Sequence, residues 1–193
     1  RTVDQVQVRG VAGERLVFAA VGGAATPNPE AMSGVGQVMP AVEGPDGGED
    51  WMVAQMGRIR AVLGLSEEAL PDPPTMPIGH HLVSEYRHAA LLHDDPMRPG
   101  RMALWARLTG HLAEDPPVMT PTVLAFLADM VPLAIAHACG VDGVGTSLDN
   151  TLRFGHMVDT EWVLLELDAH VAVGGFGHGA VHAWSTASWA AVV

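Results

Sequence analysis

The sequence predicts an α+β fold in which one long, apolar helix lies on an antiparallel β-sheet. Residues 120–138 are almost continuously apolar and are bounded by helix start and stop signals. β-like segments rich in Val, Leu, Trp and Phe follow, at 147–155, 161–173, 176–184 and 186–193. A central helix followed by consecutive strands is typical of α+β domains, because the helix buries its apolar side on one face of the sheet.

The predicted helix has clear ends and one irregular point. Thr120 is a suitable N-cap, Pro121 suits the first helical position, and Gly140 supplies a stop. The near absence of a polar face predicts a buried helix. Asp129 interrupts this apolar run, and Pro132 lacks the N–H that the helix needs, so we expect a kink beside a buried carboxylate.

The remaining segments suggest three regions. Residues 1–25 contain two apolar runs around a Gly-rich turn and predict a β-hairpin. Residues 26–50 are rich in Pro and Gly and predict a linker, while 50–64 have helical periodicity after Asp50. Residues 101–113 alternate and predict a strand. The resulting division is 1–25, a linker with one helix at 26–78, and a main domain at 79–193.

Composition excludes several classes of protein. The 193 residues carry a formal net charge of −12, and all ten basic residues are Arg, which argues against binding to phosphate backbones and hence to nucleic acid. The single cysteine, Cys139, cannot form an internal disulfide. Uninterrupted apolar runs fall short of the roughly eighteen residues of a membrane span. We therefore expect a soluble, cytoplasmic protein that does not bind membranes.

Asp129 and the hydroxyl residues after the helix are the strongest candidates for chemistry. A carboxylate in an apolar helix needs compensation, so Asp129 either pairs with an arginine or caps a neighbouring turn, or acts as a general base that orients water. Thr146, Ser147 and Asp149 follow the Gly-rich loop. Such residues usually bond to local backbone, so on their own they are weaker candidates.

A metal or cofactor site is not predicted. His80, His81, His88 and His93 are clustered in the sequence, but no cysteine or carboxylate set accompanies them at zinc-site spacing. His178 and His182 would share one side of a strand without an identifiable third ligand. The glycines of 140–145 follow a helix, which is the wrong order for a phosphate-binding loop.

Three sequence stretches resemble the C-terminal half of the acyl-CoA thioesterase II family. They are Leu124–Asp129 (LAFLAD), Ser147–Phe154 (SLDNTLRF) and Glu161–Glu166 (EWVLLE). The resemblance implies a double hotdog fold, two units that each wrap a sheet around a long helix. Residues 1–25 then resemble the last strands of a first unit that is incomplete here, and 79–193 form the second unit.

The resemblance also implies an activity and a site. The family hydrolyses acyl-CoA to free acid and CoA with a water positioned by an Asp, a Ser or Thr, and a Gln. Asp129 falls on the Asp position and Ser147 on the hydroxyl position, whereas the Gln position falls at or near Trp189. An indole N–H donates one hydrogen bond but cannot accept one. The implied partners are the acyl-CoA substrate and, because hotdog units pair, further copies of the chain.

The last hairpin departs from the family pattern. The family has a Gly-containing turn and a further apolar stretch before its final motif, whereas Trp184–Ala187 runs straight on without them. Either the turn is deleted in this chain or residues are missing between Ser185 and Thr186. A hairpin that Arg1 enters in its middle suggests that residues are missing upstream as well.

Three alternatives remain beside a thioesterase. Trp189 favours a catalytically weak or inactive hotdog protein that binds acyl-CoA thioesters. A hotdog hydratase or dehydratase would pair the Asp with a His five residues later, where this sequence has Ala134. The third alternative is a purely structural domain.

Overall fold

The chain divides into two units, Arg1–Gly34 and Val35–Val193, and each is described by itself. The computed structural model describes residues 3–26, 38–51, 53–55, 57, 83–89, 100–110, 119–141, 145–155, 159–185 and, for the backbone alone, 188–192. The predicted histidine cluster is largely outside these residues, as is the second half of the helix predicted at 50–64.

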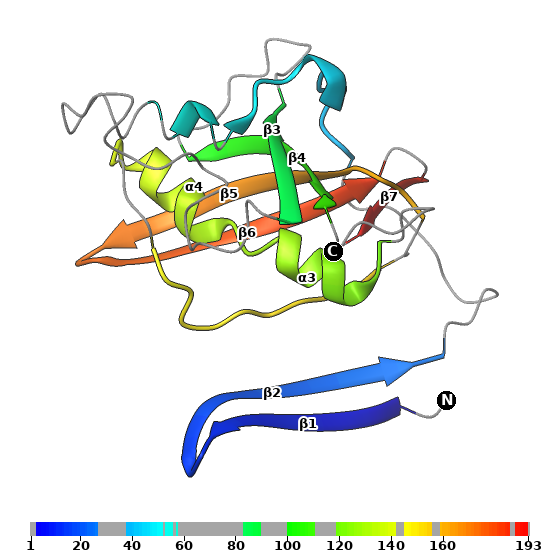
Figure 1. Ribbon diagram of the computed structural model, residues 1–193, viewed down its shortest axis with the longest axis vertical. Coiled ribbons are helices and arrows are strands. Elements are labelled where there is room, and N and C mark those ends of the chain that lie inside the picture. Colours follow the sequence, from blue (N-terminus) through cyan, green and yellow to red (C-terminus); the bar gives the residue numbers. More distant parts are fainter. Residues whose placement is uncertain are drawn as a thin grey trace. The chain divides into compact units, whose positions relative to one another are not determined.

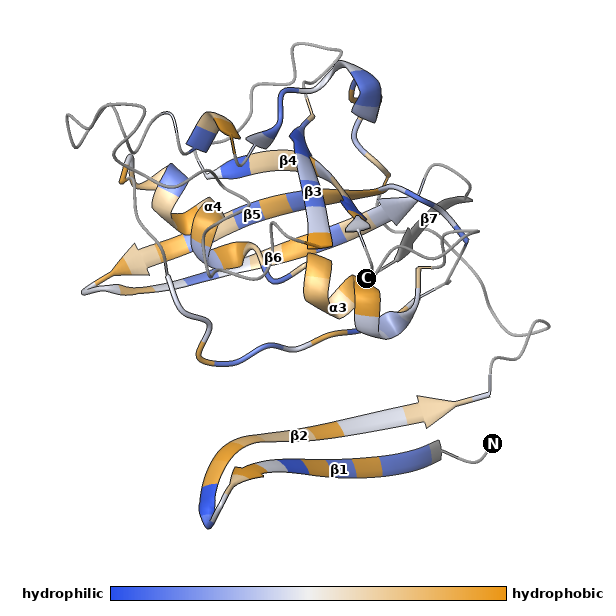
Figure 2. Ribbon diagram, in the orientation of Figure 1, coloured by the Kyte–Doolittle hydropathy of each residue, from blue (hydrophilic) through white to orange (hydrophobic). Residues whose placement is uncertain are grey.

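The first unit contains the predicted β-hairpin. Strands β1 (Val3–Ala12) and β2 (Arg15–Ala25) pair antiparallel, and Gly13 adopts a positive φ of 62° at the turn between them. Hydrophilic and hydrophobic residues alternate along β1 (Figure 2). The hairpin exposes its large apolar side chains: Val6, Val8, Val11, Leu16, Val17, Phe18 and Val21.

The second unit is built on a five-stranded antiparallel sheet with the order β3-β4-β5-β6-β7 (Figure 1). Its strands are β3 (Ser84–His88), β4 (Arg101–Leu108), β5 (Val163–Val173), β6 (Phe176–Ser185) and β7 (Ser188–Val192). Two glycines with positive φ, Gly174 and Gly175, form the tight turn between β5 and β6, which correspond to the strands predicted at 161–173 and 176–184. The α+β class with an antiparallel sheet is therefore confirmed.

One strand prediction is wrong. The strands predicted at 176–184 and 186–193 are present as β6 and β7, which pair antiparallel with Ser185 opposite Ser188. Residues 147–155, in contrast, are irregular rather than a strand. Their alternating apolar residues favour an extended backbone, but a strand also needs a neighbouring backbone to pair with, and none of the described strands pairs with this segment.

The predicted central helix is interrupted. Helices α3 (Pro121–Leu127) and α4 (Val131–Ala138) are separated by Ala128–Met130, so the expected kink is a complete break. Thr120 caps α3 as predicted, because its Oγ1 accepts a hydrogen bond from the Val123 N–H at 3.2 Å. Helix α4 restarts with Met130 as its N-cap, which places Pro132 in the first turn, where its missing N–H costs nothing.

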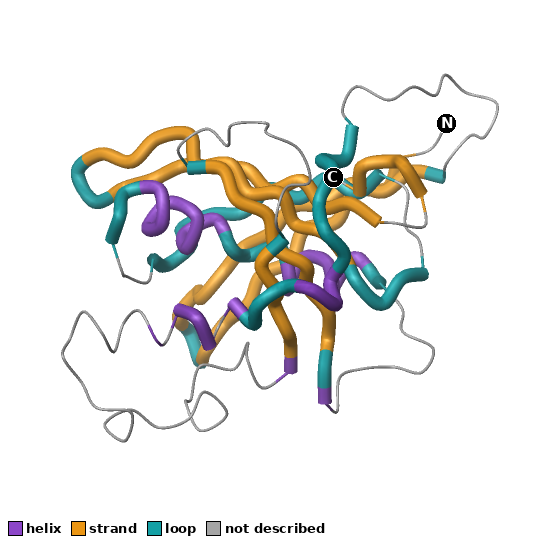
Figure 3. The backbone as a smooth tube through the Cα atoms, turned by 90° about the horizontal axis from the view of Figure 1, so that it is seen from above, coloured by secondary structure: helices purple, strands orange, loops and turns teal. Residues whose placement is uncertain are grey.

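The helical segment lies on one face of the sheet, with α4 against β5 and β6 and α3 against β4 (Figures 1 and 3). The prediction of a buried helix is wrong, since only 22% of Pro121–Ala138 is buried. By length and a mean hydropathy of 1.5 this segment is apolar enough to cross a membrane, a test that core helices of soluble proteins also pass. Its buried side chains are those that face the sheet: Leu124, Leu127, Met130 and Ala134.

The opposite face of the sheet is also covered. Trp105, Leu164 and Trp184 form a second apolar cluster there, against which Met39 and Val42 pack. The Trp105 Nε1–H donates to the Glu43 carbonyl at 2.7 Å. Residues 38–50 of the predicted linker therefore pack on the sheet, although none of them is itself buried.

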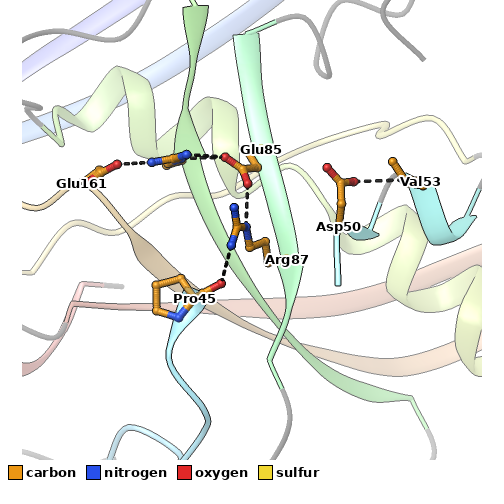
Figure 4. A network of polar contacts seen from close by, with 7 residues as sticks. Pro45, Asp50, Val53, Glu85, Arg87 and Glu161 are labelled. Carbon is orange, nitrogen blue, oxygen red and sulfur yellow. Dashed lines mark hydrogen bonds and ion pairs between the residues drawn. The ribbon is translucent and has the colours of Figure 1, made fainter. Parts of the chain in front are cut away.

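Segment 38–51, which we call the covering segment, is held to the sheet by polar contacts as well. The His88 N–H donates to the Glu49 carbonyl at 3.0 Å, and Arg87 Nη1 donates to the Pro45 carbonyl at 3.0 Å (Figure 4). Asp50 caps the next helical turn by accepting from the Val53 N–H at 3.0 Å, at the start of the helix predicted at 50–64. Trp51, next to this cap, is buried in the core under the helices.

Candidate active site

The break between α3 and α4 presents Asp129 to solvent. Asp129 is exposed, so the predicted burial of this carboxylate is wrong. An uninterrupted helix would have carried the side chain on a largely apolar surface, whereas the break places it in a non-helical turn. None of the described arginines pairs with it. An exposed carboxylate is accessible to water and to a substrate.

Two polar side chains of a distant loop converge on Asp129. The Ser147 Oγ–H donates to Asp129 Oδ1 at 2.6 Å, and Asn150 Nδ2 donates to the same oxygen at 3.3 Å. The structure therefore brings together Asp129 and Ser147, the two residues that the sequence singled out. Asn150 was not singled out from the sequence. It lies three residues after Ser147, and nothing else in the sequence pointed to a role at the site.

A close contact between glycine and proline helps to place this loop. A Cβ atom on Gly145 would lie 2.7 Å from the Cβ of Pro132, so any larger residue at 145 would clash. Pro132 is in the first turn of α4, just after the break that carries Asp129. Because Gly145 is fitted against this turn, the residues that follow it pass next to Asp129.

Tyr86 stabilises the other side of the break. Its side chain is buried under the helical segment, and its hydroxyl donates to the Leu127 carbonyl at 3.3 Å. Leu127 is the last residue of α3, so this carbonyl needs a partner outside the helix. The strand β3 thus supports the helix end two residues before Asp129.

The ionisation of Tyr86 provides a test of this arrangement. Burial raises the pKa of Tyr86 strongly, and the negative charge of Asp129 adds a smaller increase. Tyr86 is the chain's single tyrosine, so absorbance at 295 nm reports on it alone. We expect the tyrosinate absorbance of the folded protein to rise only at a higher pH than the midpoint near pH 10 that the protein shows in urea.

The sign of the linked stability follows from the same shift. Above about pH 10 the unfolded chain releases the tyrosine proton and the folded chain retains it, so the free energy of unfolding falls as the pH rises. Below that pH both states are protonated and the stability is unaffected. A folded protein whose tyrosine titrates near pH 10 would contradict the burial and the bond to Leu127.

A second polar cluster lies at the other face of the sheet and is charge-compensated (Figure 4). Glu85 accepts from both Arg87 and Arg107, and Arg107 also contacts Glu161. Burial alone would raise the pKa of Glu85, but the hydrogen bonds and charges of the two arginines outweigh it and lower the pKa. The guanidinium of Arg107 also lies 4.4 Å from the ring centre of Trp162. These contacts join β3, β4 and the start of β5, which is a structural role.

The other candidate residues are dispersed. Thr146 and Asp149 are exposed in the Ser147 loop. His178 does not pair with His182; its Nδ1 lies 3.2 Å from that of His170 on β5. Within the described residues no three His, Cys, Asp or Glu side chains could hold one metal ion. Trp189 lies on β7, whose side chains are outside the described part of the structure.

Comparison with known proteins identifies the family. The chain matches the model of the acyl-CoA thioesterase C-terminal domain over residues 64–190, more than half of its length. No curated protein shows significant sequence similarity to it.

A solved structure supports the same assignment. The chain is similar to a "putative thioesterase" from Novosphingobium aromaticivorans DSM 12444, with 25% sequence identity and a TM-score of 0.72. The match covers 100% of this chain and 64% of that chain, so this protein spans less than two thirds of its structural neighbour. The α+β fold, the antiparallel sheet and the matched residues agree, and the chain belongs to the acyl-CoA thioesterase C-terminal domain family.

Proposed function

We propose that the protein hydrolyses acyl-CoA thioesters to free acid and CoA, with Asp129 and Ser147 as its catalytic residues. The observation that carries this proposal is the 2.6 Å hydrogen bond from Ser147 Oγ to Asp129 Oδ1 at an exposed break in the helix. Membership of the thioesterase family supports thioester hydrolysis in general, and the CoA specificity is part of the proposal.

The chemistry requires a base and a positioned water. Asp129 accepts a proton from a water molecule as its oxygen attacks the thioester carbonyl carbon. Ser147 holds the carboxylate in place and contacts the same water. The tetrahedral oxyanion then collapses, the carbon–sulfur bond breaks, and the proton on Asp129 passes to the departing CoA thiolate. The products are a carboxylic acid and a free thiol.

We also propose that the protein is part of a double hotdog. Hairpin β1–β2 would belong to the first unit, and residues 79–193 would form the second. The support is the hairpin's exposed apolar surface, which needs further packing, and the greater length of the structural neighbour. Assembly into a homo-oligomer and a cytoplasmic location complete the proposal.

A catalytically weak or inactive protein that binds acyl-CoA is the second candidate. The observation that favours it is Trp189, which stands at or near the position where the family resemblance places a Gln. A tryptophan cannot accept a hydrogen bond from the attacking water. Binding without turnover would be the signature of this function.

A thiol-release assay separates the two candidates. A panel of acyl-CoAs, from acetyl-CoA to palmitoyl-CoA, is incubated with the protein, and free thiol is measured with a chromogenic disulfide. Cys139 is exposed and would react with the reagent itself, so a Cys139→Ser variant serves as the assayed protein. Thiol release in many-fold excess over protein supports hydrolysis. Calorimetric binding without release favours the second candidate, and neither binding nor release contradicts both.

A further inference from the structure

The hydrogen bonds at Asp129 are unevenly distributed between its two oxygens. Ser147 and Asn150 both donate to Oδ1, and Oδ2 receives no donor from the described residues. A carboxylate oxygen that accepts no protein hydrogen bond is available to accept one from water or to take up a proton. The two donors therefore hold Oδ1 and leave Oδ2 available to water.

One donor alone would not fix this arrangement. The terminal torsion of an aspartate is broad, so a carboxylate held by a single hydrogen bond can still rotate about its last bond. A second donor on the same oxygen restricts that rotation, because turning the carboxylate would break both bonds. Asn150 supplies this second donor, and the contact of Gly145 with Pro132 helps to place the loop that carries it.

The amide group suits this purpose. An Asn side chain offers two N–H donors, and facing an ionised carboxylate it must present its nitrogen rather than its oxygen. Hydrogen bonds to charged groups are also stronger than those between neutral groups. Asn150 is exposed, so its hydrogen bond to Asp129 contributes little to the packing of the core. A role at the site explains this hydrogen bond better than a role in packing.

We propose that Asn150 is a positioning residue, which holds the Asp129 carboxylate so that Oδ2 faces the attacking water. This inference rests on the proposed function, since it assigns Asn150 a part in the same reaction. It acts through Asp129 and contacts neither the thioester nor the water.

The test compares variants that remove or retain the donor. Asn150→Leu keeps the approximate size and removes the donor, while Asn150→His keeps a nitrogen two bonds beyond Cβ. We expect kcat for Asn150→Leu to fall about tenfold to a hundredfold with KM within about twofold, the loss expected for one hydrogen bond to a charged group. Asn150→His is expected to recover most of kcat.

A matched control is available at the next residue. Thr151 is exposed in the same loop, and Thr151→Val should leave kcat and KM unchanged. Melting temperatures of all variants within a few degrees of the parent protein would show that folding is intact. An Asn150→Leu variant with unchanged kcat would overturn the inference, as would a loss that Thr151→Val reproduces.

A spectroscopic measurement separates this inference from the proposed function. The side-chain NH₂ group of Asn150 gives a resolvable ¹⁵N–¹H signal, and hydrogen bonding to a carboxylate shifts its proton downfield. We expect that shift to disappear in Asp129→Ala. If the parent protein releases no thiol but the shift is present, the proposed function fails and the contact made by Asn150 stands. If thiol is released and the shift is absent, the function stands and the inference fails.

Discussion

The Asp129→Ala variant is expected to lose about 10²–10⁴-fold in kcat for acyl-CoA hydrolysis, the range typical of removing a general base. In the proposed mechanism Asp129 takes the proton from the attacking water. The loss should appear mainly in kcat, because Asp129 would act on the water and not on the bound acyl chain.

The fold of this variant should survive. Asp129 is exposed, and its described hydrogen-bond partners are the side chains of Ser147 and Asn150, which can bond to water instead. We expect a melting temperature within a few degrees of the parent protein. Asp159→Asn, which changes an exposed carboxylate elsewhere, is the control for loss of charge. Turnover that is unchanged in Asp129→Ala would refute the assignment of Asp129.

The largest effect on stability is expected from Trp105→Ala. Trp105 is 2% exposed and packs with Leu164 and Trp184 on the face of the sheet opposite the helices. Its indole also donates to the Glu43 carbonyl, which fastens the covering segment. Truncation of a buried Trp leaves a large cavity, so we expect the free energy of unfolding to fall by about 3–5 kcal/mol.

Urea unfolding followed by far-UV circular dichroism measures this loss. Fluorescence is unsuitable, because the substitution removes one of five tryptophans. Val53→Ala is the control, since Val53 is 57% exposed and its truncation should cost less than about 0.5 kcal/mol. A loss below about 1 kcal/mol for Trp105→Ala would show that the covering segment does not depend on Trp105.

Strand β4 shows what the alternation of apolar residues can predict and what it cannot. Alternation predicts a strand at 101–113, and Met102, Leu104 and Ala106 on one side of it lie in the core under the helices. Trp105 interrupts the alternation, because it lies on the other face of the sheet, which is apolar as well. That face is covered by a segment whose prolines and glycines predicted a linker. Composition described the local backbone of this segment but did not indicate where it packs.

The candidate site was also predictable only in part, because the sequence shows residue types but not which distant segments pack together. Residue type and resemblance singled out Asp129 and Ser147, and the structure brings them within hydrogen-bonding distance. Asn150 and the supporting Tyr86 carried no local signal, because each acts through a contact with a residue far away in the sequence. The exposure of Asp129 was also missed, since Pro132 predicted a kink but not a complete break.

The sequence by itself determined the elements whose signals are local. These are the two hairpins, the capped start of the helix at Thr120 and the faces of the central strands, because each depends on hydrogen bonds or on side-chain alternation among near neighbours. Only the tertiary structure decided which segments pack against one another. The covering segment buried a second face of the sheet, and the loop after Gly145 placed Ser147 and Asn150 on one oxygen of Asp129. Such contacts join residues that are distant in the chain, and their energies depend on a fit that no local pattern records.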